Sequence, residues 1–184
     1  MLCTRVLVLI FVLLLAACGV CAALFPLMRT KGPMIDGHPS ERVVFLWYEE
    51  TKFTVGPAHY YTRTYHRNST CDGFKTAALA SAALDVAGCG LAGIIGLLAA
   101  AHLCSRMKFS ICCSIMVLCF VAFACFVASV ATVIFTFFTD TCVNDNATRV
   151  VALRDQGFVL VEGFIFLCIA AGGFLIAVFV EIFS

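Results

Sequence analysis

The sequence predicts an all-α transmembrane fold: a four-helix bundle that carries a small extracellular β-sheet. The first reason is composition, because 62% of the residues are hydrophobic and only 12% are charged. A soluble globular domain is nearer half apolar and a quarter charged, so the lipid bilayer is the expected solvent. The second reason is a long and almost uncharged stretch in the middle of the chain. The third is that two polar segments separate the apolar ones.

The central stretch, residues 76–138, is long enough for two membrane spans. Its charged side chains are Asp85, Arg106 and Lys108. A helix needs roughly 20 apolar residues to cross the hydrocarbon core, and the two basic residues mark the only place to fold the stretch. We therefore expect antiparallel helices over 76–103 and 109–138, joined by a short inner turn at 104–108.

Two further apolar runs lie at the ends of the chain. Residues 6–24 follow a single arginine and form a longer run than the roughly 7–15 apolar residues of a signal peptide. This length favours a retained first span, although the small residues at 21–23 could serve as a signal-peptide cleavage site. Residues 157–183 predict the fourth span. Four spans place both termini on one side of the membrane and two polar loops, 25–75 and 139–156, on the other.

The first polar loop has the pattern of a small sheet. Residues 42–48 (RVVFLWY) and 59–66 (HYYTRTYH) are rich in β-branched and aromatic side chains. The second run alternates with the two-residue period of a half-exposed strand. Gly-Pro and Asp-Gly pairs around these runs supply turns. We expect an antiparallel sheet at 42–66, and a disordered loop is the alternative.

Two features place both polar loops outside the cell. Asn68-Ser69-Thr70 and Asn146-Ala147-Thr148 are acceptor triplets for N-glycosylation, one in each loop. Of the twelve cysteines, only Cys71 and Cys142 lie in the polar loops, and disulfides persist in oxidising compartments. The count of basic residues opposes this orientation, because nine of the twelve lie in the proposed outer segments. The short inner turn with its two basic residues supports it.

The same reasoning predicts a disulfide between Cys71 and Cys142. Cys71 precedes the second span and Cys142 follows the third, so the two emerge at the same height on adjacent helices, roughly 8–10 Å apart. A few residues at each exit can bring the Cα atoms into the range of about 4.4–6.8 Å that a disulfide requires. We expect this bridge to clamp the two outer loops together.

Few residues inside the predicted spans could carry chemistry. Asp85 and Glu162 are intramembrane carboxylates, which are functional candidates because burying them is costly. They could form a proton or ion relay, or take a paired structural role inside the bundle. Gly88, Ala92 and Gly96 form a strip of small residues that predicts close helix packing, within the bundle or in a dimer. We find no catalytic, cofactor-binding or metal-ligating pattern, and the net charge of +1 gives no reason to expect nucleic acid.

The layout and three short stretches resemble known families. Four spans with a long, Trp-bearing first outer loop resemble the claudin-like architecture. Phe45-Leu46-Trp47 is similar to the Thr-Leu-Trp of the amastins, surface glycoproteins of trypanosomatid parasites, whose motif is Cys-x-Thr-Leu-Trp-Gly-x-Lys-x-x-Cys. Residues 135–142 (FTFFTDTC) and 156–164 (QGFVLVEGF) resemble the exit from the third amastin helix and the entry to the fourth. Besides Phe45, four motif positions differ and hold Val43, Tyr48, Glu50 and Phe53, so both motif cysteines are absent.

The sequence therefore predicts a non-enzymatic surface glycoprotein of the plasma membrane that makes contacts through its outer loops. The resemblance implies such a role at a host interface, and no catalytic residue carries over from it. Expected partners are membrane lipids, further copies of the chain or other surface proteins, with both termini in the cytoplasm. Two alternatives stay open: a transporter or channel-like subunit that uses Asp85 and Glu162, and a subunit of a larger membrane complex.

Overall fold

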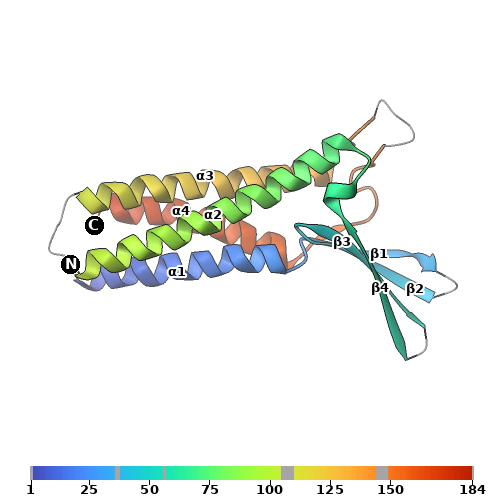
Figure 1. Cartoon of the computed structure of the whole chain (residues 1–184), viewed down its shortest axis with the longest axis horizontal. Helices are drawn as coiled ribbons and strands as arrows, with labels where there is room; N and C mark the ends of the chain where they lie inside the picture. Colours follow the sequence, from blue (N-terminus) through green and yellow to red (C-terminus); the bar gives the residue numbers. More distant parts are fainter. Residues whose placement is uncertain (1, 36–37, 56, 105–109, 144–148, 184) are drawn as a thin grey trace.

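The computed structural model describes residues 2–35, 38–55, 57–104, 110–143 and 149–183, and it confirms the predicted fold class. Four long helices form a bundle, and a five-stranded antiparallel sheet stands at one end of it (Figure 1). The helices are α1 (Leu2–Leu24), α2 (Asp72–Cys104), α3 (Ser110–Phe138) and α4 (Glu162–Phe183). The strands are β1 (Met28–Ile35), β2 (His38–Val44), β3 (Tyr48–Val55), β4 (Ala58–Tyr65) and β5 (Val159–Leu160).

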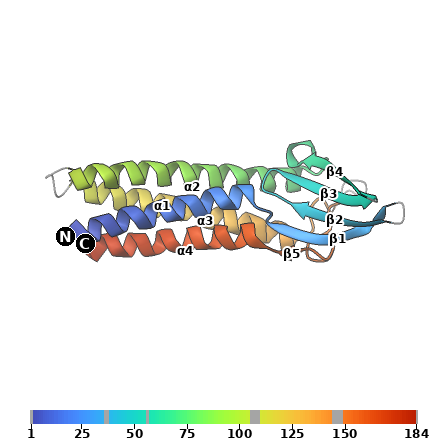
Figure 2. The ribbon, with the colours of Figure 1, turned by 90° about the horizontal axis from the view of Figure 1, so that it is seen from below.

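Each helix of the bundle packs against two others. α1 contacts α2 and α4, and α3 contacts the same two helices, so the four close into a ring. All four are long and apolar enough to cross a membrane. Large apolar side chains such as Leu7, Leu97 and Phe120 are exposed on the outside of this ring, as a lipid-facing surface requires. α1 begins and α4 ends at the end of the bundle away from the sheet (Figure 2).

Small residues let the helices approach one another closely. The predicted strip of Gly88, Ala92 and Gly96 is buried inside the bundle. A Cβ atom on Gly88 would lie 2.8 Å from the ring of Phe126 in α3. That ring stacks on Phe174 of α4, with ring centroids 5.5 Å apart. The strip therefore serves packing within the chain, the first of the two interpretations.

The sheet is a meander with one added strand. Its order is β4-β3-β2-β1-β5, and every neighbouring pair is antiparallel. Strands β1 to β4 follow one another between α1 and α2, whereas β5 is a two-residue strand between α3 and α4. The sheet therefore combines residues from both polar loops, and the disordered alternative for the first loop is wrong.

The predicted strand at 42–48 is split by a turn. β2 ends at Val44 and β3 begins at Tyr48, and the Phe45 N–H donates to the Tyr48 carbonyl oxygen at 2.8 Å. The reason is that Leu46 in the turn is buried against the bundle, with an exposed fraction of 3%. Strand β1, the first residues of β2, and β5 extend the sheet beyond the predicted range of 42–66.

Two helix boundaries also differ from the prediction. α2 begins at Asp72 instead of residue 76, directly after Cys71. α4 begins at Glu162 instead of residue 157, because Gly157 forms a turn with a φ of 80° and the next residues pair with β1 as β5. Most of the predicted inner turn, 105–108, and the second acceptor triplet at Asn146 lie outside the described residues.

Candidate functional site

The predicted disulfide closes the sheet end of the bundle and is confirmed. Cys71 stands directly before α2, Cys142 is the fourth residue after α3, and their Cα atoms are 5.8 Å apart. Cys71 is buried, and Cys142 has a φ of 57°, a left-handed conformation that is unfavourable for residues other than glycine. The bridge holds the start of α2 to the segment that follows α3.

Polar contacts hold this segment in place as well. Thr141 and Val150 exchange two backbone hydrogen bonds of 2.9 Å. The Arg149 guanidinium donates to the Asp140 carboxylate at 2.5 Å, and the Ala152 amide donates to the same carboxylate at 2.8 Å. The bond from Arg149 and that from Ala152 hold the pKa of Asp140 below its ordinary value.

The β2–β3 turn contains the motif-like triplet Phe45-Leu46-Trp47 and joins the sheet to the bundle. Leu46 points into a cavity between the sheet and the helices, whereas Trp47 is 42% exposed. Phe45 is half-buried and stacks on Tyr48, with ring centroids 4.7 Å apart. The triplet therefore anchors the sheet through its central leucine and leaves its tryptophan exposed.

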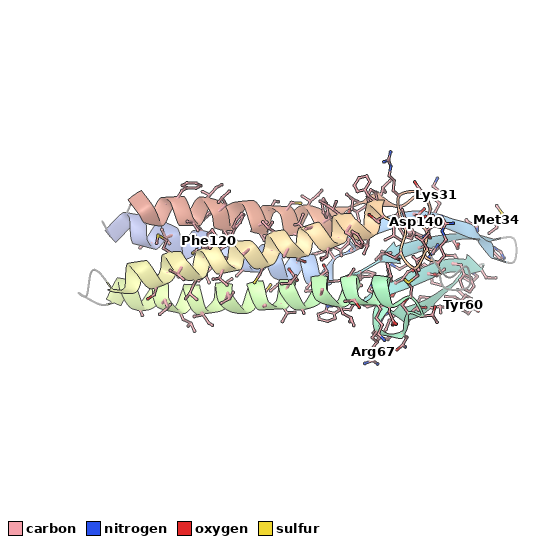
Figure 3. All side chains as sticks on the ribbon, turned by 90° about the horizontal axis from the view of Figure 1, so that it is seen from above. Lys31, Met34, Tyr60, Arg67, Phe120 and Asp140 are labelled. Carbon is pink, nitrogen blue, oxygen red and sulfur yellow. A yellow bond between two sulfur atoms is a disulfide. The ribbon has the colours of Figure 1, made fainter. Side chains whose placement is uncertain are left out.

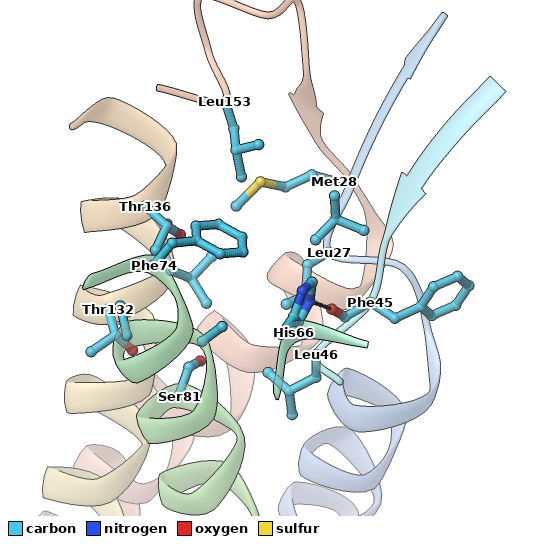
Figure 4. A pocket seen from close by; sticks show the side chains of 14 residues that line it. Leu27, Met28, Phe45, Leu46, His66, Phe74, Ser81, Thr132, Thr136 and Leu153 are labelled. Atoms are coloured by element: carbon cyan, nitrogen blue, oxygen red, sulfur yellow. Dashed lines mark hydrogen bonds between the residues drawn. The ribbon is translucent and has the colours of Figure 1, made fainter. Parts of the chain in front are cut away.

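A buried histidine completes this junction. The Nε2–H of His66 donates to the Phe45 carbonyl oxygen at 2.9 Å (Figure 4), and its backbone N–H donates to the Trp47 carbonyl oxygen at 3.1 Å. Its ring also meets Phe74 of α2 edge-on, with centroids 5.5 Å apart. Burial lowers the pKa of His66 below its ordinary value, although the Phe45 carbonyl and Glu49 act in the opposite direction. Sequence analysis did not single out His66, because nothing local in the sequence shows that its ring is buried.

The cavity beside His66 is small (Figure 4). Its volume is about 30 Å³, and its lining is mainly apolar, with hydroxyls from Ser81, Thr132 and Thr136. The Thr132 and Thr136 hydroxyls already donate to backbone carbonyl oxygens of α3 at 2.8 and 2.9 Å. This volume suits roughly one or two water molecules, so the cavity as it stands is too small for an organic ligand.

The two intramembrane carboxylates lie in different surroundings. Asp85 has no exposed surface, and neither of its carboxylate oxygens has a hydrogen-bond partner among the described residues. One turn earlier, the Ser81 hydroxyl lies 3.0 Å from that of Ser129 in α3, and the Ser129 hydroxyl donates to the Ser81 carbonyl oxygen at 3.0 Å. The serine hydroxyls thus bond across the α2–α3 interface, and the paired role expected for Asp85 is not seen. Glu162 is exposed in the first turn of α4.

Strand β4 forms one edge of the sheet and is exposed along its whole length. The Arg63 guanidinium donates to the Glu50 carboxylate at 2.6 Å and lies 5.2 and 5.3 Å from the ring centroids of Tyr48 and Tyr61. Glu50 is buried in the neighbouring strand, and the ammonium group of Lys52 is 3.3 Å from its other oxygen. Burial raises the pKa of Glu50, but the bonds from Arg63 and Lys52 outweigh it and hold that pKa below its ordinary value.

Aromatic and basic side chains continue along this edge. Tyr60 stacks on Phe53 of β3 with ring centroids 5.3 Å apart, and the Arg67 guanidinium lies 5.4 Å from the ring centroid of Tyr65. Figure 3 shows Tyr60 and Arg67 at the sheet end of the molecule. Asn68, the first acceptor for N-glycosylation, is exposed in the short 3-10 helix η1 (His66–Asn68) just after this strand.

A comparison with known protein families finds no match, and a search of curated proteins finds none either. The fold nevertheless defines the class, a multi-pass membrane protein with four spans. Its antiparallel sheet, with four strands between the first two helices, is consistent with a claudin-like architecture.

Proposed function

We propose that the protein is a non-enzymatic, amastin-like glycoprotein of the cell surface that makes contacts through its sheet. One observation carries the proposal: all eight residues of β4 are exposed, and they include three tyrosines, one arginine and one histidine. Figure 1 shows the sheet, with β4 in it, beyond the end of the helix bundle. Exposed aromatic and arginine side chains are the residue types that interfaces favour.

In the proposed membrane orientation, the sheet lies outside the cell. The Cys71–Cys142 bridge lies at the sheet end, and disulfides persist in oxidising compartments. Asn68, at the same end, is exposed and in an acceptor triplet. Because α1 begins and α4 ends at the opposite end of the bundle, both termini then face the cytoplasm. Trp47, half-exposed where sheet and bundle meet, suits the aromatic belt of a membrane–water interface.

A contact role is favoured over catalysis because many charged groups of the sheet and of the second outer loop are paired with one another. Ion pairs join Arg29 to Glu41, Arg42 to Glu49, Arg63 to Glu50 and Arg149 to Asp140. Paired in this way, the charges order the surface, and the exposed rings of Tyr60 and Tyr61 are left for a partner. Lipid headgroups, host material and further copies of the chain all suit such a surface.

Transport through the carboxylates is the rival function, and the geometry favours it less. A relay needs a polar path to Asp85, which has no exposed surface. On α2, the lining of the cavity ends one turn earlier, at Ser81. Glu162 is exposed at the start of α4. The remaining alternative, a subunit of a larger complex, predicts that other chains copurify with the protein in stoichiometric amounts.

Topology on intact cells tests the proposal. The full chain carries a C-terminal tag, and intact cells are treated with a membrane-impermeant biotin reagent, with and without a glycosidase. We expect a glycosidase-sensitive mobility shift that Asn68→Gln and Thr70→Ala reduce and that Thr70→Ser preserves, because serine keeps the acceptor triplet. The tag should be protected until the cells are permeabilised. A tag accessible on intact cells would refute the proposed orientation.

A further inference from the structure

Strand β4 is an unprotected sheet edge. Its pairing with β3 runs without a break from Tyr48–Tyr65 to Val55–Ala58. Natural edge strands are usually kept short, bulged, or marked with proline or lysine, because open edges pair with other chains. Residues 58–65 (AHYYTRTY) contain neither proline nor lysine, and the strand is as long as any other in the sheet. The opposite edge, β5, has two residues and leads directly into α4.

Two backbone hydrogen bonds show which backbone groups of β4 point outward. The Phe45 N–H donates to the Tyr48 carbonyl, so Tyr48 bonds towards β2, and the His66 N–H donates to the Trp47 carbonyl. Residues along an antiparallel strand bond alternately to one neighbour and to the other. Even-numbered residues of β4 therefore bond to β3. Odd-numbered residues, from His59 to Tyr65, direct their N–H and C=O groups away from the sheet.

This strand is complementary to a second, antiparallel copy of itself in one register. With Thr62 opposite Thr62, each Arg63 lies opposite Tyr61 of the other copy, and the outward backbone groups of these residues face each other. Centring the pair on Arg63 would oppose two like charges, which is destabilising. Centring it on Tyr61 would place His59 opposite Arg63. Centring it on Thr64 would set Arg63 opposite Tyr65 but would pair only residues 63–65 of the strand. The Thr62 register pairs residues 59–65 and sets a cation against an aromatic ring on both sides of the centre, an attractive arrangement.

The surroundings of Arg63 also suit a buried interface. Its guanidinium is already held by Glu50 at 2.6 Å, so its charge has a partner before a second copy arrives. The rings of Tyr48 and Tyr61 lie beside it on the same face. A second copy would add its own Tyr61 to this group and complete an aromatic enclosure around the cation.

We infer that β4 of one copy pairs antiparallel with β4 of a second copy, with Thr62 opposite Thr62, and joins the two sheets into one. This inference rests on the proposed surface function and specifies one partner for it, a second copy of the chain. Addition of a strand to an open sheet edge is an established mode of recognition, in which the backbone supplies affinity and the side chains supply register.

A cysteine at the centre of the register tests the inference. Thr62 opposite itself would be a pair without mutual hydrogen bonds, with Cα atoms about 4.5 Å apart, which a disulfide can bridge. Thr62→Cys in the full chain, expressed in cells and mildly oxidised, should therefore give a disulfide-linked dimer on a non-reducing gel. The matched control is Thr64→Cys, which lies on the same face and is also exposed. Its two copies would lie roughly 13 Å apart along the strands and should stay monomeric.

A second variant separates pairing from simple proximity. Tyr61→Pro, added to Thr62→Cys, removes an outward N–H and leaves the bonds to β3 intact, because residue 61 does not bond to that strand. It should lower the dimer yield about tenfold or more. A membrane-impermeant maleimide should label both reduced cysteine variants on intact cells, which reports the outward orientation separately.

Each outcome decides a different point. Dimers from Thr62→Cys alone support the inference. Equal dimer yields from the two cysteine variants, or labelling of both without any dimer, overturn the inference and leave the surface function standing. A lack of labelling on intact cells overturns the inference together with the proposed orientation.

Discussion

Removal of the Cys71–Cys142 bridge tests how far the membrane itself orders the unfolded chain. The sequence separation of the bridge is 71 residues, and closure of such a loop in a free chain would be worth about 4 kcal/mol at 25 °C. A chain whose helices stay inserted is not free, because α2 and α3 pack against each other. α2 begins directly after Cys71, and Cys142 is the fourth residue after α3. A loop of about five residues gives about 2 kcal/mol by the same relation, and this is the loss we expect.

The assay compares Cys71→Ala/Cys142→Ala with the parent protein in detergent micelles. Both are unfolded by titration with SDS, and the fluorescence of Trp47, the only tryptophan, reports the junction of sheet and bundle. Alanine tolerates the left-handed backbone at position 142 no better than cysteine does, so the energetic cost of this conformation is nearly the same in both proteins. Cys168→Ala, which removes an exposed thiol of α4, is the control and should change the free energy of unfolding by less than about 0.5 kcal/mol.

Two results would contradict this reasoning about the bridge. A loss of about 4 kcal/mol would show that α2 and α3 separate when the protein unfolds, because the full loop would then be released. A loss no larger than that of the Cys168→Ala control would show that the outer segments keep their positions without the bridge.

Three further predictions concern the bundle and its junction with the sheet. Gly163→Ala should lower the free energy of unfolding by roughly 1–3 kcal/mol, because a Cβ would lie 2.6 Å from backbone oxygens of the α1–β1 link. The control is Gly90→Ala, where the Cβ would meet open space, and it should be neutral or stabilising in the same SDS titration. Asp85→Leu should raise that free energy by about 1–3 kcal/mol, since leucine buries no oxygen without a partner; a loss of stability would refute this. Stability should fall as the pH drops below 6.5, because the lowered pKa of His66 makes the folded state bind fewer protons than the unfolded state. A His66→Gln variant, titrated over the same pH range, should lose this slope.

The helices could be predicted because a bilayer imposes a length and a composition on every span. Their ends near the sheet could not, since tertiary contacts determine them. Residues 159–160 are as apolar as the helix that follows, yet they pair with β1. β1 itself contains the Gly32-Pro33 turn signal, and the strand absorbs this pair through a shift of register. No local pattern distinguishes such a shift from a strand end.

Those parts of the candidate site that depend only on the arrangement of the spans could be predicted from the sequence. Two loop cysteines at the ends of one helical hairpin have few other partners, so the disulfide followed from the arrangement of spans. The burial of Asp85 followed from its position in a span, but its lack of a partner depends on how α2 and α3 face each other. The exposure of β4 on both faces could not be predicted from the sequence, because the alternation of its side chains predicts that one face is covered.

The contacts that attach the sheet to the bundle imply an order of folding steps during biosynthesis. Strands β1 to β4 lie within residues 28–65, so their meander can close as soon as that segment has been made. The carbonyl oxygens of Pro26 and Leu27 accept hydrogen bonds from Gly163 and Val161, which the ribosome adds roughly 130 residues later. Until then the sheet contacts the bundle through the β2–β3 turn and through His66 against Phe74 of α2, without these two bonds. Insertion of the last helix is therefore the step that completes the attachment of the sheet to the bundle, and a chain released before that step would carry a formed sheet on a three-helix bundle.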